Sequence, residues 1–187
     1  MTAKPSYLGL LNAIAIGEGE AECYLNAWAE VTPSDEVRQV LTTVAIREGE
    51  HAKAFAKRLC ELGYSVRERA DGNAAERMDI ASSRDLSDRE KFERLDLTRD
   101  GDGNGRDIFS GMFDDRTIDI QTGALLGRYI AEERDSGRLL RSCYQQLRQA
   151  DAGGADAAGG AGNGQADVEA RLDRIEGLLE QLVSRQG

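Results

Sequence analysis

Apolar residues recur at helical spacing along most of the chain. Over residues 7–31 and 35–62 they follow one another at steps of three and four, which places them on one face of an α-helix. This pattern predicts two long helices. Pro33 ends the first and Ser34 is a suitable N-cap for the second. So short a connection forces the two helices into an antiparallel hairpin.

The pattern is weaker over residues 64–115. One helical piece is expected over 74–83, and the capping-box sequence Ser-Asp-Arg-Glu at 87–90 predicts another over 88–97. We interpret the two pieces as a broken third helix.

A fourth helix is predicted from Asp119, a plausible N-cap, to Arg148. Strand patterns are nearly missing from the chain. The predicted fold class is therefore all-α, and we expect residues 6–149 to form an antiparallel four-helix bundle in which the third helix is broken.

The composition changes after the bundle. Residues 150–165 are mostly Gly, Ala and Asp, which predicts a flexible linker. Over residues 166–186 a coiled-coil heptad stripe follows, formed by Val168, Leu172, Ile175, Leu179 and Leu182. Because so short a helix is marginal alone, we expect another copy, the bundle or a different protein to cover its apolar face.

Polar residues interrupt the apolar faces of the long helices at four core positions. These are Glu18 in the first helix, Glu48 and His51 in the second, and Glu133 in the fourth; His51 is the single histidine of the chain. Since residues three apart share a helix face, Glu48 and His51 can point to one place. A buried carboxylate needs a metal ion, a hydrogen-bonding partner or a proton, and each remains open at this point.

A sequence repeat favours the metal. The run Ala-Ile-x-Glu-Gly-Glu occurs at residues 15–20 and again at 45–50, so Glu18 and Glu48 hold equivalent places in neighbouring helices. Two antiparallel helices with inward carboxylates at matching heights can share a cation.

The fourth helix carries only part of the same pattern. Ser136 stands three residues after Glu133, where a second histidine would complete a Glu-x-x-His pair. A hydroxyl is a poor ligand beside imidazole, although it can hold a water molecule or orient a carboxylate. Tyr129 lies one turn before Glu133 and is either an ordinary core tyrosine or a hydrogen-bond donor to a site carboxylate.

Further candidate ligands carry weaker signals. In the broken third helix Glu93 is the candidate inward carboxylate, with Glu90 and Glu76 as rivals, and an exposed face is the alternative for each. The first half of a calcium loop is formed by Asp100, Asp102 and Asn104. Glycine stands at the twelfth loop position, where a glutamate is expected, so a solvated acidic loop is the alternative.

The net charge, the lengths of the apolar runs and the cysteine spacing disfavour or exclude several classes of function. A net charge of −10 disfavours nucleic acid and anionic membranes as partners and is compatible with attracting cations. No apolar run is long enough to cross a bilayer and no signal peptide is recognisable, so a cytoplasmic location is expected. The cysteines Cys23, Cys60 and Cys143 form no Cys-x-x-Cys pair, which excludes a zinc ribbon or rubredoxin module. We expect each of them to be a core or half-buried residue.

These helices and their polar residues resemble the ferritin-like superfamily, nearest to rubrerythrin-type domains. The segment Glu-Gly-Glu-His-Ala-Lys at 48–53 is similar to the Glu-x-x-His segment of the family's second helix. Glu18 falls where the first-helix glutamate lies, and Glu133 where the fourth-helix glutamate lies. The resemblance covers residues 6–149 and is poor at the third helix.

The resemblance implies a four-helix bundle around a buried di-iron or di-manganese centre. Members of the family oxidise ferrous iron, reduce peroxide or store iron, and they assemble into dimers or larger shells. By this resemblance Glu18 would be a terminal ligand, Glu48 and Glu133 would bridge the metals, and His51 would bind one of them. Glu22 is an additional candidate. The missing second histidine and the unplaced third-helix carboxylate put a symmetric centre in doubt.

Two functions follow from the sequence. The first is a metal-dependent oxidoreductase that uses iron or manganese in reactions of oxygen or peroxide and forms a homo-oligomer. The second is a redox-inactive bundle that acts as an oligomeric scaffold or binds a partner protein. In a scaffold, arginines or shared protons would hold the inward glutamates.

Overall fold

The computed structural model describes residues 4–68, 72–98, 111 and 114–157. Within these ranges the secondary structure is entirely helical and consists of α1 (Leu8–Val31), α2 (Asp35–Glu61), α3 (Ala74–Ser82), α4 (Asp88–Arg94) and α5 (Ile120–Ala157). The predicted all-α fold class is confirmed for this part of the chain. No helix in it is both long enough and apolar enough to span a membrane.

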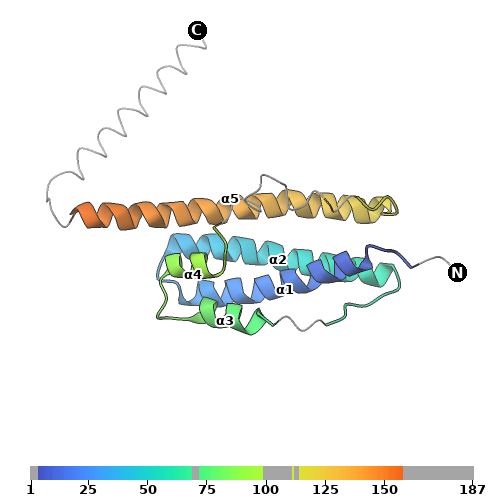
Figure 1. Cartoon of the computed structure of the whole chain (residues 1–187), viewed down its shortest axis with the longest axis horizontal. Helices are drawn as coiled ribbons and strands as arrows, with labels where there is room; N and C mark the ends of the chain where they lie inside the picture. The colour runs from blue at the N-terminus through green and yellow to red at the C-terminus, as the bar shows by residue number, and fades with distance from the viewer. Residues whose placement is uncertain (1–3, 69–71, 99–110, 112–113, 158–187) are drawn as a thin grey trace, which may run out of the picture. The chain divides into compact units, whose positions relative to one another are not determined.

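The helices α1 and α2 form the predicted antiparallel hairpin and lie side by side over most of their length (Figure 1). Ser34 caps α2, since its Oγ accepts a hydrogen bond from the backbone N–H of Val37 at 3.2 Å. Arg38 donates to the carbonyl oxygens of Ala29 and Thr32 at 3.1 and 2.6 Å, which ties the start of α2 to the end of α1.

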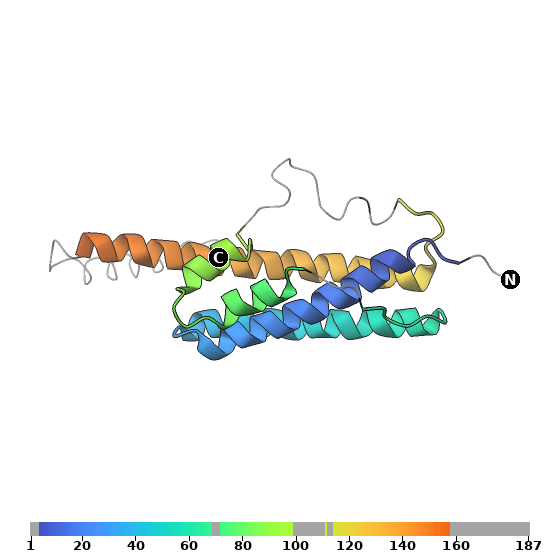
Figure 2. The same cartoon turned by 60° about the horizontal axis from the view of Figure 1, so that its bottom comes forward.

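The short helices α3 and α4 lie near the end of the hairpin where α1 passes into α2 (Figures 1 and 2). The predicted capping box is present at the start of α4, between Ser87 and Glu90. Asp88 is buried and accepts hydrogen bonds from Trp28 Nε1 and Thr32 Oγ1, both at 2.6 Å, so α4 is fastened to the end of α1. The predicted extent of this helix to residue 97 is wrong, because Asp96 adopts φ of 58°.

The helix α5 begins where the sequence predicts. Asp119 caps it by accepting hydrogen bonds from the backbone N–H groups of Gln121 and Thr122, both at 3.0 Å.

The end of α5 differs from the sequence prediction at residues 150–157, which were expected to belong to a flexible linker. The chain is helical to Ala157 instead of ending its helix at Arg148. Alanine has the highest helix propensity, and extending a formed helix needs no new nucleus, which offsets the unfavourable glycines. By its contacts the chain divides into two compact units between Leu147 and Arg148, and the described part of the second unit is the last segment of α5. Residues 158–165 and the predicted heptad helix at 166–186, with its expected partners, lie outside the described residues.

Two apolar clusters fill the interior of the first unit. Core 1 lies near the α1–α2 turn and includes Leu25, Trp28, Val37, Leu41, Val44, Phe92, Leu140 and Cys143. Core 2 lies toward the other end of the hairpin and includes Leu11, Ile14, Phe55, Leu59, Leu126 and Ile130. Cys143 is buried as expected, whereas Cys23 and Cys60 are exposed because they lie off the inward faces of α1 and α2. Along each of the three long helices, the predicted polar core positions fall between core 1 and core 2.

Candidate metal centre

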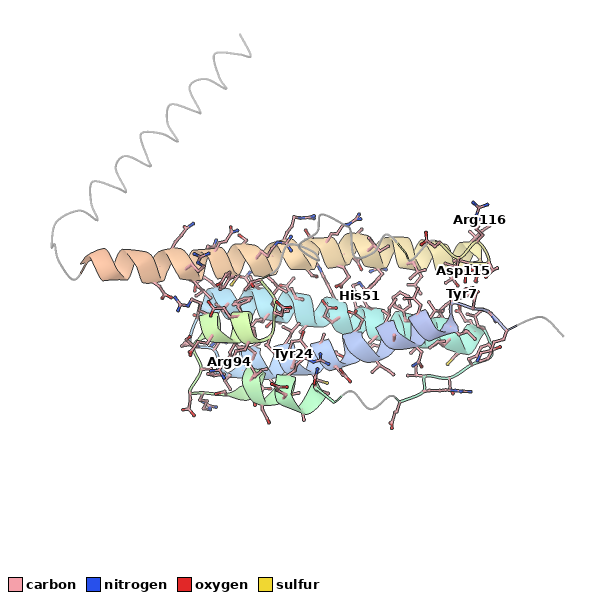
Figure 3. All side chains as sticks on the ribbon, in the orientation of Figure 1. Tyr7, Tyr24, His51, Arg94, Asp115 and Arg116 are labelled. Carbon is pink, nitrogen blue, oxygen red and sulfur yellow. The ribbon has the colours of Figure 1, made fainter. Side chains whose placement is uncertain are left out.

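Four side chains from three helices meet between the two cores. Each offers one ligand atom, and the four atoms lie within 4.8 Å of one another: Glu18 from α1, Glu48 and His51 from α2, and Glu133 from α5. The first three residues are only 8, 5 and 4% exposed, and the Glu133 side chain is 21% exposed. Figure 3 shows His51 about midway along α2. The structure therefore brings together all four residues that the sequence predicts as metal ligands.

Three carboxylate oxygens face the Nδ1 atom of His51. The distances are 3.4 Å to Glu133 Oε1, 3.7 Å to Glu18 Oε2 and 3.8 Å to Glu48 Oε2. Among the described residues, His51 Nδ1, Glu18 Oε2 and Glu133 Oε1 have no hydrogen-bond partner although all three are buried. Burying a polar atom without a hydrogen-bond partner costs free energy, so these three atoms are candidates to bind a ligand. A cation at the point on which they converge would satisfy all three.

The other sides of these ligands are held by hydrogen bonds. The Tyr129 hydroxyl donates to Glu18 Oε1 at 2.8 Å, which is the donor role considered for it from the sequence. His51 Nε2 lies 2.7 Å from Glu132 Oε2. Because an ionised carboxylate can only accept, Nε2 carries the proton of this bond. Nδ1 is thus the nitrogen of His51 that can become a ligand once a cation displaces any proton on it.

The cluster holds protons where a cation would bind. Burial raises the pKa of Glu48 to about 9, against the opposing effect of His51. Burial by itself would lower the pKa of His51, but the facing carboxylates, Glu133 foremost, raise it to about 12. At neutral pH both groups are therefore protonated, and their protons partly neutralise Glu18 and Glu133. A divalent cation can replace these protons, since metal binding requires deprotonated ligands.

Arginines do not neutralise the three inward glutamates. Within the described part of the chain, no arginine forms an ion pair with Glu18, Glu48 or Glu133. The nearby Arg47 pairs with Asp135 at 2.7 Å, and Arg128 with Glu132 at 2.9 Å. Of the two arrangements expected for a scaffold, the one with arginines is absent from these residues, and the one with shared protons agrees with the raised pKa of Glu48.

Ser136 lies beside the group of four but is engaged elsewhere. It is 2% exposed, and its Oγ accepts a hydrogen bond from Arg47 at 3.4 Å. Its position in the sequence, one turn after Glu133, matches that of a second histidine, yet its hydroxyl bonds to a guanidinium.

Glu22 lies against α2 next to the group of four. Its carboxylate occupies the space that a Cβ at Gly49 would need, and it lies 3.5 Å from Lys53 Nζ. The absence of a side chain at Gly49 therefore makes room for Glu22. This glutamate, an additional candidate from the sequence, does not belong to the group of four.

The proposed third-helix ligand does not reach the centre. Glu93 is exposed, accepts a hydrogen bond from the Tyr144 hydroxyl at 2.9 Å and lies 3.6 Å from Arg89. Its rival Glu90 forms the capping box of α4, and Glu76 is exposed in the first turn of α3. Of the two readings considered for Glu93, the structure shows the exposed one, because α4 packs beside Trp28, at the turn end of the hairpin. The calcium-loop candidates Asp100, Asp102 and Asn104 lie outside the described residues.

Sequence reasoning missed Glu132. It precedes a predicted ligand, and its side chain is 30% exposed, so it falls at the edge of the inward face of α5. One signal was present: Arg128 stands four residues earlier and donates to Glu132 at 2.9 Å. A glutamate held by such a pair can accept a further hydrogen bond. Its partner, His51, lies on another helix and therefore cannot be predicted from the sequence of α5.

Comparison of the chain with known protein families, with curated proteins and with solved structures found no match. Support for a metal centre therefore comes from the geometry and chemistry of the side chains.

Proposed function

We propose that this chain is a ferritin-like metal-binding protein that holds iron or manganese in the core of a helical bundle and takes part in oxygen- or peroxide-linked iron oxidation. The observation that carries the proposal is the convergence of His51 Nδ1, Glu18 Oε2 and Glu133 Oε1, all buried and without hydrogen-bond partners among the described residues. The long helices and the Glu-x-x-His spacing in α2 support the ferritin-like arrangement.

The donor set is compatible with iron or manganese. Three carboxylates and one imidazole combine the oxygen ligands that suit manganese with the nitrogen ligand that suits iron. Bound iron would supply one-electron redox chemistry, which the protein side chains do not provide.

The surroundings suit a reaction with a small oxidant. Core 1 and core 2 lie on either side of the centre along the helices, and they keep water away from Glu18, Glu48 and His51. The α5 side is more open, because the side chains of Glu132 and Glu133 are 30 and 21% exposed. We expect ions and small oxidants to reach the centre past these two residues.

Metal binding is the first test. Protein stripped with a chelator is titrated with Mn²⁺ and, without oxygen, with Fe²⁺, and bound metal is measured for wild type, Glu48→Gln and Glu50→Gln. Glu50 serves as a control because it lies on α2 close to Glu48, its side chain is 62% exposed, and its ion pair with the exposed Arg128 is long, at 3.8 Å. We expect the wild type and Glu50→Gln to bind metal at the centre and Glu48→Gln to lose most of this affinity.

Oxidation is the second test. Oxygen or peroxide is added to the Fe²⁺-loaded protein, and the remaining ferrous iron is followed with a colorimetric chelator. The wild type should oxidise Fe²⁺ faster than Glu48→Gln does. If the wild type binds neither metal and a chelator leaves its thermal stability unchanged, the metal proposal fails and a redox-inactive scaffold is the better description.

A further inference from the structure

The donors at the candidate centre suffice for one cation. We infer that the centre holds a single metal ion per chain, because the positions from which a second ion would take its ligands are engaged in other contacts. This inference rests on the proposed metal-binding function and concerns the number of ions, which that function leaves open.

The described residues supply fewer ligands than a two-ion centre uses. Bundle proteins with two metal ions use one glutamate from each of two helices and a Glu-x-x-His pair from each of the other two. The described residues here supply one such pair, Glu48 and His51, together with Glu18 and Glu133. Half of the second pair and one single glutamate are therefore missing from this set.

The spacing of the ligand atoms fits one ion. Two ions in a shared site lie about 3.5–4 Å apart, and each needs its own ligands. Around one ion with bonds of about 2.1 Å, neighbouring ligand atoms lie about 3 Å apart and opposite ones about 4.2 Å apart. The observed separations from His51 Nδ1, between 3.4 and 3.8 Å, are on the scale of one coordination sphere.

The surroundings of Ser136 are unsuitable for a second ion. A second imidazole would be needed at this position, but the Ser136 hydroxyl accepts a hydrogen bond from Arg47 at 3.4 Å. Asp135 fixes the same guanidinium at 2.7 Å. The Arg47 guanidinium therefore stands beside Ser136, and a second cation placed there would meet a like charge.

The position of α4 keeps the candidate third-helix glutamate away from the centre. In a two-ion centre another glutamate would come from the third helix, and Glu93 was the best candidate. Its carboxylate accepts a hydrogen bond from Tyr144, while the adjacent Phe92 packs against Trp28 in core 1. This packing holds α4 away from the four ligands.

The test counts the ions and asks whether they interact. Metal-stripped wild type is titrated with Mn²⁺, bound manganese is measured per chain, and the bound ion is examined by electron paramagnetic resonance. Manganese held by surface carboxylates is subtracted with a parallel titration of Glu48→Gln. We expect one ion per chain at the centre and the hyperfine spectrum of an isolated Mn²⁺. Two ions per chain, or a spin-coupled spectrum, would overturn the inference and leave the proposed function intact.

Ser136→Ala gives a second test. If Ser136 serves no metal, removing its hydroxyl should leave the number of bound ions unchanged and the Mn²⁺ affinity within about threefold. Two bound ions in the wild type and one in Ser136→Ala would show that Ser136 supports a second site and would contradict the inference. Failure of the wild type to bind any ion is a different result, since it would refute the proposed function itself.

Discussion

The Nε2 atom of His51 lies 2.7 Å from Oε2 of Glu132, which joins the histidine of α2 to a carboxylate on α5. Arg128, one turn earlier on α5, donates to the other oxygen of Glu132 at 2.9 Å. The imidazole is thereby held with Nδ1 toward Glu18, Glu48 and Glu133. Such an outer carboxylate fixes the orientation of a ligating histidine and strengthens it as a ligand.

Replacing Glu132 should therefore weaken metal binding although Glu132 is not among the four ligands. We expect Glu132→Ala to reduce Mn²⁺ affinity about 10- to 100-fold. Glu132→Gln keeps an oxygen that can accept the proton of Nε2, so its affinity should lie between those of Glu132→Ala and the wild type. Titration calorimetry measures the three affinities. Equal affinities for wild type and Glu132→Ala would show that this hydrogen bond does not orient the ligand.

The glycine beside Glu48 offers a test of how tightly α1 and α2 fit together. Alanine in a helix interior is more favourable than glycine by up to about 1 kcal/mol. Gly17→Ala on α1 should show this gain, because a Cβ there meets no atom within 4 Å. Gly49→Ala should gain less, because its Cβ must displace the Glu22 carboxylate.

Urea unfolding of the two glycine variants measures the difference. Adding Glu22→Ala to Gly49→Ala removes the obstructing carboxylate and should restore the missing part of the gain. If Gly49→Ala and Gly17→Ala stabilise the protein equally, Glu22 moves aside at no cost and its position has no effect on the helix pair.

The cap of α5 should make stability depend on acid pH. Burial alone would raise the pKa of Asp119, but hydrogen bonds, first from Thr122 and then from Tyr7 and Arg58, hold the pKa well below its usual range. The folded protein thus binds this proton more weakly than the unfolded chain does. The stabilisation is present in full above about pH 4, the usual pKa of an aspartate, and is lost as the pH falls below that value.

Asp119→Ala should accordingly lower the free energy of unfolding by about 0.5–2 kcal/mol at neutral pH. The difference from wild type should narrow in urea titrations at about pH 3. Asp79→Ala is a suitable control, since this aspartate is exposed on α3. A difference between wild type and Asp119→Ala that stays constant down to about pH 3 would show that the ionised carboxylate is not the source of the stabilisation.

The attachment of α4 should depend on Asp88. This carboxylate is 8% exposed and accepts hydrogen bonds from Trp28 and Thr32 at 2.6 Å. Hydrogen bonds to a charged group contribute about 1.5–3 kcal/mol each, so Asp88→Ala should destabilise the protein by about 3 kcal/mol or more. Asp85→Ala, an exposed neighbour, should change stability by less than about 0.5 kcal/mol.

Trp28 is the single tryptophan of the chain, so its fluorescence reports directly on this contact. Its emission should shift in Asp88→Ala and stay the same in Asp85→Ala. A shifted emission without a loss of stability would mean that α4 contributes little to the folding of the protein.

The helices and their inward faces could be predicted because they depend on local spacing. Leu41, Val44, Glu48, His51 and Phe55 are all buried on one side of α2, as their spacing predicts. The same reasoning placed Glu18 inward on α1. The end of α5 was missed because a segment of Gly, Ala and Asp has no apolar periodicity, although alanine continues a helix that has already formed.

The contacts between helices could not be predicted in the same way. Glu132 and Glu133 are adjacent in sequence, yet Glu133 faces His51 Nδ1 and Glu132 bonds to His51 Nε2. Which of them meets which nitrogen depends on how far α5 is rotated and shifted relative to α2. The pairing of Ser136 with Arg47 depends on the same relation.

The amino-acid order alone determined where the long helices run and that Glu18, Glu48, His51 and Glu133 point inward, because a period of 3.6 residues assigns each side chain to a face. Tertiary structure decided that these four meet within 4.8 Å, that Glu93 stays away, and that Glu132 holds the imidazole. The physical reason is that core 1 and core 2 set the heights and rotations of α1, α2 and α5 against one another. Only their combined packing brings ligands from separate helices to one point.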